Sequence, residues 1–549
     1  MKRRNFIKNT GLGAISIPFL NGISFQSLAA SPFQKLLTTV SNPDRILVVV
    51  QMNGGNDGLN TLIPISEYSH LSQSNSNGGR SNILIDENEV LKLVYNSVNQ
   101  HPGTGLHPAM TGFSNLFSNG QLAVLQGVGY PNPSFSHFRA TDIWLSGSDS
   151  NVYWDTGWAG RFIEHEHPNY SSNLPQDPVA ITVGAISSTA YNGSEQNMGL
   201  AVQDPTSTGY FSGNTDVAPN SLYGYELENI RKVIQQSDDF SNRLTTAFNN
   251  GSNVANYPTD NALAQQLKTV ARLIKGDLQS NFYLVNIGSF DTHDSQVNNG
   301  DVKTGWHADN LGKLADAINI FMQDINSMSN ANGLMGDQVL GLTFSEFGRT
   351  IKSNDTSGTD HGTTGPMFMF GNHVQTSVIG ENPSIYDNAN NRIKSDLDMQ
   401  FDFRSVYASI FHEWFGMNKT DIDGLFGKTF EDGTAPNQDI YDGGFHCNLP
   451  ILKGMPIPLE PETAINENQK TNFDFHPNPS TGKVKFVGLD NSSYSVNIIS
   501  NDGKLLHNSQ YSGQELQNGV NFNLSRGYYT ISVQNQAKNF VESKRLMVQ

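Results

Sequence analysis

The chain has 549 residues, a length that predicts more than one domain. Its 51 acidic residues outnumber its 34 basic residues, and the formal net charge of −17 argues against a nucleic-acid-binding protein, which needs a basic face. Hydrophobic residues make up 37% of the chain, enough for a sizeable core. The single cysteine, Cys447, excludes an intramolecular disulfide and a cysteine-rich metal site.

Residues 1–29 have the pattern of a signal peptide. A basic start is followed by a short apolar stretch and by the small-x-small pattern of residues 27–29. Arg3 and Arg4, with Phe6, resemble the twin-arginine signal, which implies export by the twin-arginine translocase. The alternative is an ordinary signal that happens to hold two arginines. No later segment has the roughly 18 consecutive apolar residues that a membrane span requires, so none is expected in the mature chain.

The middle of the chain alternates predicted strands with predicted helices. Apolar runs predict buried strands at 46–50, 282–287, 339–344 and 367–370. Apolar residues at helical spacing predict helices near 263–274, 311–321 and 406–414. This alternation predicts a doubly wound, mainly parallel α/β sheet within residues 44–445. The segment from about 140 to 260 is loop-rich and shows no clear pattern.

The pattern of apolar residues and prolines changes after residue 445. Several prolines without a clear period predict a linker over 446–472. Short alternating strands then predict a separate β-sandwich over 473–549. This last segment resembles the C-terminal sorting domain of type IX secretion substrates, on four landmarks in order: His476-Pro477-Asn478-Pro479, Asp502-Gly503-Lys504, Arg526-Gly527-Tyr528-Tyr529 and Lys544-Arg545-Leu546. The resemblance implies passage through the type IX machinery and a secreted or cell-surface protein; the alternative is a generic adhesive sandwich.

Polar motifs follow the predicted strands. In an open parallel sheet, sites form beyond the carboxyl ends of the strands. The motifs there are Asn53-Gly54-Gly55-Asn56-Asp57-Gly58, Asp291-Thr292-His293-Asp294 and Ser345-Glu346-Phe347-Gly348-Arg349-Thr350, with Gly358-Thr359-Asp360-His361-Gly362 just before the last strand. Such a mixture of oxygen and nitrogen ligands suits zinc, manganese, magnesium or calcium. We therefore expect a metal site at this edge, although each motif alone could be a turn or a helix cap.

Together with Ser136-His137-Phe138, Trp144 and Gly147, these motifs resemble the family of unknown function numbered 1501. That family is similar to the alkaline phosphatase and sulfatase superfamily, and the resemblance runs from about residue 44 to 445. It implies an alkaline phosphatase-like α/β fold. It carries less information about activity, since the family is largely uncharacterised.

The superfamily comparison suggests a role for each candidate residue. Ser136, eleven residues before Gly147, resembles the nucleophile, with a helix N-cap as the alternative. The metal ligands would be drawn from Asp57, Asp291, His293, Glu346, Asp360 and His361. Asn53 or Asn56 could replace Asp57. Because Ser345 stands where phosphatases carry a carboxylate, one metal ion is as well supported as two. Arg349 could bind an oxyanion, or could form a structural ion pair.

Two functions follow from this pattern. The first is an exported metal-dependent hydrolase of phosphate or sulfate esters. Sulfatase chemistry through a formylglycine is disfavoured, because residues 134–139 lack the required pattern. The alternative is a non-catalytic surface or binding protein on a degenerate alkaline phosphatase-like scaffold.

Overall fold

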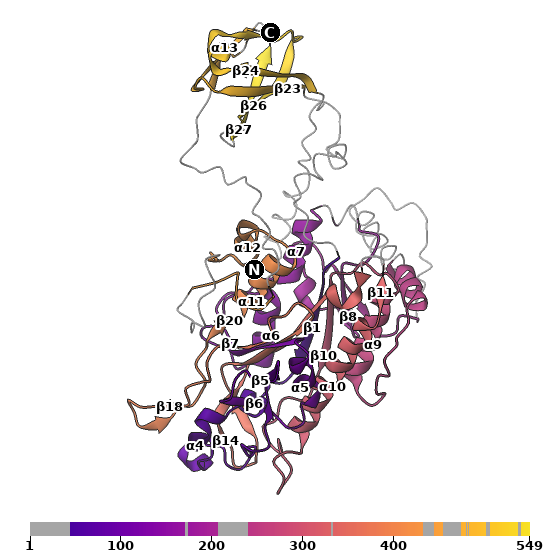
Figure 1. The fold of residues 1–549 in the computed structure, drawn as a ribbon, viewed down its shortest axis with the longest axis vertical. Helices are drawn as coiled ribbons and strands as arrows, with labels where there is room; N and C mark the ends of the chain where they lie inside the picture. The colour runs from indigo at the N-terminus through magenta and orange to yellow at the C-terminus, as the bar shows by residue number, and fades with distance from the viewer. Residues whose placement is uncertain are drawn as a thin grey trace, which may run out of the picture. The chain divides into compact units, whose positions relative to one another are not determined.

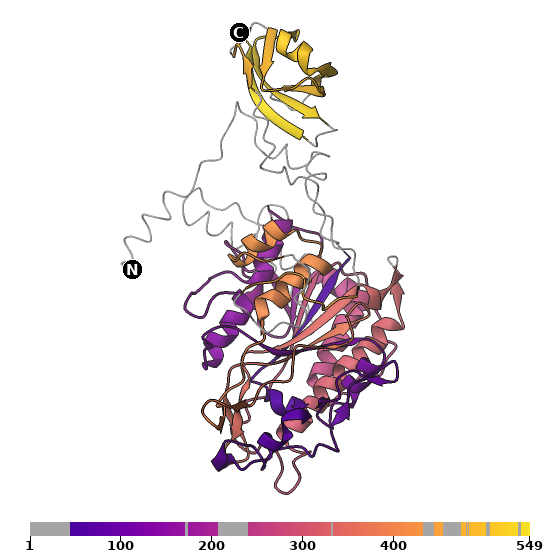
Figure 2. The same cartoon turned by 60° about the vertical axis from the view of Figure 1, so that its left-hand side comes forward.

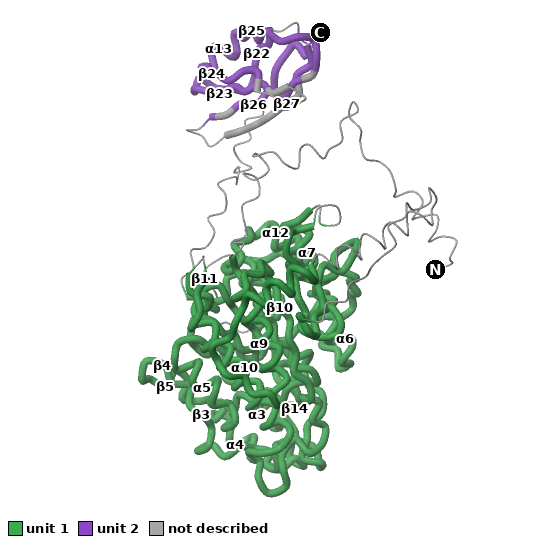
Figure 3. Tube along the Cα trace, turned by 90° about the vertical axis from the view of Figure 1, so that its right-hand side faces the viewer, with its two compact units in different colours: residues 1–458 green, residues 459–549 purple. Residues whose placement is uncertain are grey.

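The computed structural model describes residues 44–168, 170, 174–206, 240–330, 333–431, 444–453, 474–478, 480, 483–500, 505–535 and 540–548. The chain divides into two compact units, residues 1–458 and 459–549, which Figure 3 distinguishes by colour. The predicted signal peptide, most of the predicted linker and the landmark Asp502-Gly503-Lys504 lie outside the described residues.

The first unit is built on a nine-stranded sheet. Its main path runs in the order β17 (Val378–Ile379), β7 (Leu122–Gly129), β16 (Gly365–Gly371), β13 (Val339–Ser345), β1 (Ile46–Met52), β10 (Phe282–Ile287), β8 (Ala180–Val183) and β9 (Gly199–Val202), and β20 (Phe401–Asp402) pairs with β7. All neighbours are parallel except that β16 is antiparallel to both β13 and β7. The predicted mainly parallel sheet is therefore confirmed.

Strand β1 shows why the sheet is buried on both faces. Its apolar side chains alternate between two cores: Leu47 and Val49 belong to one, whereas Val48, Val50 and Met52 belong to the other. Since successive side chains of a strand point to opposite faces, a continuous apolar run requires cover on both sides. The prediction that this run is a doubly buried strand is confirmed.

Helices supply that cover on each face, and their layers can be followed in Figures 1 and 2. The core that contains Val48 is completed by α5 (Thr111–Ser118), α9 (Ala262–Lys275) and α10 (Trp306–Asn326). The core that contains Leu47 is completed by α6 (His137–Ser146), α7 (Trp158–Glu166), α11 (Phe403–Ser409), the π-helical turn Ile410–Trp414 and α12 (Lys419–Phe426).

Two segments differ from the sequence-based expectation. The region between 140 and 260 contains α6, α7 and the strands β8 and β9. Each of these two strands is only four residues long, and polar loops flank them. Residues 446–453 do not begin a linker, because Cys447, Leu449 and Ile451 are fully buried in the core of the first unit. The described part of the predicted linker thus packs onto the α/β unit.

The described residues of the second unit are all-β apart from one short helix, α13 (Gly513–Asn518). A four-stranded antiparallel sheet has the order β24 (Leu505–Ser512), β23 (Ser493–Ser500), β26 (Gly527–Asn535) and β27 (Phe540–Val548). A three-stranded sheet joins β21 (Asp474–His476), β22 (Lys483–Val487) and β25 (Val520–Asn521). Val484, Phe486, Val496 and Ile531, contributed by both sheets, share one core. The all-β character predicted for this segment is confirmed.

Candidate metal centre

Three neighbouring strands end at the same level of the sheet. Met52, the last residue of β1, is in register with Ile287 of β10 on one side and with Ser345 of β13 on the other. The polar loops that follow these strands must therefore begin side by side. This register explains how motifs separated by more than 200 residues in the sequence come together.

Asp291 lies at the centre of the resulting cluster. Its Oδ1 is 3.3 Å from Nε2 of His293 and 3.5 Å from Nε2 of His361, and its Oδ2 is 3.4 Å from Nε2 of His137. The ring nitrogens Nε2 of His293 and His361 are 2.9 Å apart. Three imidazoles thus direct the same ring atom towards one carboxylate, and ligand atoms of His137, Asp291 and His361 all lie within 4.8 Å of one another.

The other ring nitrogen of each histidine faces an oxygen atom. Nδ1 of His137 is 2.9 Å from Oε1 of Glu346, and Nδ1 of His361 is 2.8 Å from the backbone oxygen of Phe135. Nδ1 of His293 is 3.4 Å from Oδ1 of Asp360. An Nδ1–H that donates to such an oxygen leaves Nε2 with its lone pair towards the centre, and this arrangement is typical of histidines that bind metal ions.

The charges around the centre favour an ionised Asp291 and a neutral His361. Partial burial opposes ionisation of Asp291, but Arg349, His137 and His293 outweigh it and lower the pKa of its carboxyl below the usual value. Burial lowers the pKa of His361, and the neighbouring Arg349 and histidines lower it further, although the hydrogen bond with Phe135 acts in the opposite direction. A carboxylate and a neutral imidazole are the forms that bind a cation.

Arg349 fixes the backbone beneath the cluster. Its side chain is buried and donates to the carbonyl oxygens of Gly54, Gly55, Phe290 and Thr359 and, from Nη2, to Oδ1 of Asp291 at 2.7 Å. All three guanidinium nitrogens are thereby engaged. The sequence left two roles open for Arg349, binding an oxyanion or forming a structural ion pair. These contacts match the structural ion pair, in which Arg349 positions Asp291.

Gly54 and Gly55 permit this close packing. Both have positive φ angles, +122° and +82°. A Cβ atom at residue 54 would lie 2.3 Å from the backbone nitrogen of Asp291, and one at residue 55 would lie 2.3 Å from the ring of Phe347. A side chain at residue 54 would displace the loop that carries Asp291, and one at residue 55 would displace the ring of Phe347.

Ser136 lies between two residues that touch the cluster. The preceding carbonyl, of Phe135, contacts His361, and the following residue is His137. Ser136 is exposed and stands at the N-cap of α6, yet its side chain accepts no hydrogen bond from the helix. Further along α6, Trp144 donates from Nε1 to the backbone oxygen of Glu346 at 2.9 Å, and this hydrogen bond connects the helix to the residues around the centre.

The remaining predicted ligands have other partners. Asp57 is fully buried, and both its oxygens lie 2.9 Å from Nη1 of Arg80, with Gln296 donating to Oδ2 at 2.6 Å. Glu346 is buried and accepts from the backbone N–H of Gly54 at 2.8 Å. The hydroxyl of Ser345 joins the loop backbone, donating to the oxygen of Met52 and accepting from the N–H of Asn56. The structure thus places Asp57 apart from the cluster and makes Glu346 a support for His137.

His137 is a residue of the cluster that the sequence did not predict as a ligand. Within its motif the resemblance to a nucleophile points to Ser136 instead. The signal that could have identified His137 is its position in the first turn of a helix that starts beside the strand ends. A histidine there faces the same edge of the sheet as Asp291 and His361.

These observations define a mainly parallel α/β unit with a His/Asp centre at its strand ends, followed by an all-β unit. Residues 236–422 match the model of a family described as a protein of unknown function, DUF1501. Residues 474–549 match the secretion system C-terminal sorting domain. Both resemblances drawn from the motifs are confirmed. The first match includes Asp291, His293, Glu346 and His361 but does not reach Ser136 or His137.

The sorting domain places the protein outside the cell or at the cell surface, by way of type IX secretion. Within the described residues, no helix is both long enough and apolar enough to cross a membrane. Comparison with curated proteins gave no match.

Two solved structures are similar at a low level. A protein of the alkaline phosphatase superfamily from Vibrio parahaemolyticus matches at 8% identity and a TM-score of 0.29, over 91% of this chain and 82% of that one. PorZ, described as an essential surface component of the type IX secretion system of Porphyromonas gingivalis, matches at 20% identity and a TM-score of 0.13. That match covers 16% of this chain and only 12% of PorZ. Neither likeness carries an argument about activity.

Proposed function

We propose that the protein is an exported, metal-dependent hydrolase of phosphate or sulfate esters. The observation that carries the proposal is the convergence of His137, Asp291 and His361, whose ligand atoms lie within 4.8 Å of one another. His293 extends the set, with Nε2 3.3 Å from Asp291. The outward-facing nitrogens are held by a carboxylate or a carbonyl, as metal-binding histidines require.

The donor set favours one ion and a particular kind of ion. Imidazole nitrogens with one carboxylate suit zinc, whereas magnesium and calcium prefer oxygen ligands. Asp57, Ser345 and Glu346, which would have held a second ion, are engaged by Arg80, by backbone groups and by His137. We therefore favour a single zinc ion. When bound, such an ion supplies positive charge that stabilises the charge developing on an ester oxygen.

Ser136 is the candidate nucleophile. Its exposed hydroxyl does not cap α6, so it is available to attack phosphorus or sulfur while the bond to the leaving alcohol breaks. The N-terminus of the ten-residue helix α6 adds a partial positive charge on the same side, which favours an anionic group. The residues on either side of Ser136 are both held: His137 contacts Glu346, and the carbonyl oxygen of Phe135 contacts His361.

A second candidate is the non-catalytic surface protein. The observation in its favour is Ser345, which stands in place of a carboxylate and whose hydroxyl is committed to the backbone of Met52 and Asn56. A centre reduced to one ion is compatible with binding alone. Export by the twin-arginine route stays a prediction from Arg3 and Arg4.

Metal content and ester hydrolysis test the two candidates together. The full chain is purified, loaded with zinc or manganese and assayed on 4-nitrophenyl phosphate, 4-nitrophenyl sulfate and a phosphodiester. The hydrolase predicts about one ion per chain and turnover that a chelator abolishes. Metal binding without turnover of any ester would favour the surface protein. If the chain showed no metal binding and no turnover, the metal centre itself would be refuted.

A further inference from the structure

Gln296 is a fully buried side chain that connects two segments carrying candidate metal ligands. Its Oε1 lies 3.0 Å from the hydroxyl of Thr292 and 3.0 Å from the hydroxyl of Thr359. Thr292 directly precedes His293, and Thr359 comes two residues before His361. The backbone N–H of Thr359 also donates to the carbonyl oxygen of Thr292 at 3.1 Å. One amide oxygen thus joins the two segments next to their histidines.

The buried Asp57 determines which end of the Gln296 amide faces the threonines. Burial opposes ionisation of Asp57, but interactions led by the charge of Arg80 outweigh it and lower the pKa of the carboxyl below its usual value. An ionised carboxylate only accepts hydrogen bonds, so the atom of Gln296 that lies 2.6 Å from Oδ2 of Asp57 is the amide nitrogen. The amide oxygen is then fixed towards the two threonines, and both hydroxyls donate to it.

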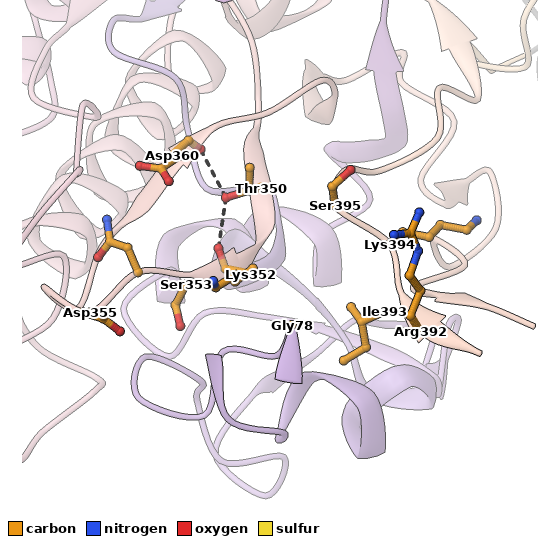
Figure 4. Close-up of a pocket in the computed structure, with 11 residues that line it drawn as sticks. Gly78, Thr350, Lys352, Ser353, Asp355, Asp360, Arg392, Ile393, Lys394 and Ser395 are labelled. Carbon is orange, nitrogen blue, oxygen red and sulfur yellow. Dashed lines mark hydrogen bonds between the residues drawn. The ribbon is translucent and has the colours of Figure 1, made fainter. Parts of the chain in front are cut away.

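The buried Arg80 extends this network to a pair of strands. Besides binding the carboxylate, it donates to the carbonyl oxygen of Thr350 at 2.7 Å. Thr350 belongs to β14 (Arg349–Ser353), which is antiparallel to β15 (Thr359–His361). Figure 4 shows the hydroxyl of Thr350 donating to the backbone oxygen of Asp360 within that pair. The loop after β1 is therefore connected to both strands of the pair.

We propose that Gln296 is a positioning residue of the metal centre: supported by Asp57, it sets the separation between His293 and His361, whose Nε2 atoms are 2.9 Å apart. The inference rests on the proposed metal centre, and Gln296 itself makes no contact with the ion. An ion binds tightly only where its ligands are held at the required spacing by the residues around them. Asp57, which the sequence suggested as a ligand, acts on the centre through this hydrogen bond instead.

The zinc affinity of the full chain, measured by competition with a chromogenic chelator, tests the inference without using hydrolysis. Gln296→Met keeps the length of the side chain but removes the amide. Thr359→Val removes one hydroxyl and keeps the branched shape, whereas Thr359→Ser keeps the hydroxyl. The matched control is Thr104→Val, which removes a buried hydroxyl that donates to the carbonyl oxygen of Ile63 at 2.8 Å, in β6 (Thr104–Leu106) of a separate three-stranded sheet. The thermal unfolding midpoint checks that each variant is folded.

We expect Gln296→Met to weaken zinc binding by about tenfold and Thr359→Val by about threefold, and we expect Thr359→Ser and the control to stay within about twofold of the original chain. Because Gln296→Met and Thr359→Val break the same contact, adding Thr359→Val to Gln296→Met should cost less than about twofold more. The comparison of Thr359→Val with Thr359→Ser decides the question even if the Gln296 variant does not fold.

Two kinds of result would overturn the inference. If the original chain binds zinc but the Gln296 and Thr359 variants bind it equally well, lose no more affinity than Thr104→Val, or lose affinity independently of each other, Gln296 does not position the ligands and the metal centre stands without it. If the original chain itself binds no zinc, the proposed metal centre is refuted, and the role of Gln296 with it.

Discussion

Glu346 holds His137 in place: Oε1 of the buried carboxyl lies 2.9 Å from Nδ1 of the imidazole and also accepts the backbone N–H of Gly54 at 2.8 Å. This single oxygen links helix α6, strand β13 and the loop after strand β1. It fixes the orientation of the imidazole ring, so that Nε2 turns towards Asp291. The position of the candidate metal ligand is thus set by a side chain that does not itself face the centre.

Replacing Glu346 with glutamine should weaken metal binding by about 10- to 100-fold, because the amide oxygen can still accept a hydrogen bond but no longer carries the charge that strengthens the imidazole as a ligand. Zinc affinity measured by competition with a chromogenic chelator checks this expectation. Glu195→Gln, on an exposed loop of the same unit, should leave the affinity unchanged. Equal affinities for Glu346→Gln and the original chain would show that the carboxylate does not support a ligand.

Replacing Ser136 with alanine should reduce ester hydrolysis by at least about a thousandfold and leave metal content unchanged, since Ser136 is the candidate nucleophile and contributes no atom to the cluster. Turnover and metal content are measured on the same preparation. Ser118→Ala, on helix α5, serves as the control and should keep full activity. Retained hydrolysis in the Ser136 variant would exclude a covalent role for the hydroxyl.

The stability of the first unit should fall as the pH drops below about 6.5. Burial lowers the pKa of His307 to about 4 and that of His107 to about 3. The unfolded chain takes up a proton on each histidine near pH 6.5, whereas the folded chain does not, so the stabilisation is present above that pH and is lost as the pH falls. For His307 the loss between pH 6.5 and 4 is on the order of 3 kcal/mol.

Urea unfolding at several pH values measures this slope. His307→Gln should flatten it, because glutamine can replace the hydrogen bond between Nε2 and Asn56 without titrating. His165→Gln, a partly exposed histidine on helix α7, should leave the slope as it is. An unchanged slope in the His307 variant would show that this histidine does not contribute to the acid sensitivity.

Removing residues 459–549 should leave the α/β unit folded but prevent its display at the cell surface. The two units are separate by their contacts, and residues 474–549 match the sorting domain. The unfolding transition of the truncated protein and its location in fractionated cells are the two measurements. A truncated protein that still reached the surface would show that this domain is not the sorting signal.

The fold was predictable because its strands leave a strong pattern. The runs beginning at Ile46, Phe282 and Val339 are apolar on both faces, and each became a strand of the central sheet within two residues of the predicted ends. Strands β8 and β9 were missed because four residues among polar loops give no usable period. The extension of the core to Ile451 was hidden by the prolines that follow it.

The candidate site was predictable in its place but not in the role of each residue. Polar loops after parallel strands must meet at one edge, so Asp291, His293 and His361 could be expected together. Long-range partners could not be read from the motifs. Asp57 is bound by Arg80, 23 residues further along the chain. Arg349 donates its hydrogen bonds to four carbonyl oxygens and to Asp291. The resemblance points to Ser136 rather than His137, because a motif carries no information about the direction of a side chain.

The most direct test of the metal centre is zinc-edge anomalous diffraction from crystals of the full chain grown with saturating zinc. The account predicts one anomalous peak about 2.0–2.2 Å from Nε2 of His137, Nε2 of His361 and a carboxylate oxygen of Asp291. Ordered side chains at these three residues, with no anomalous density between them, would contradict it.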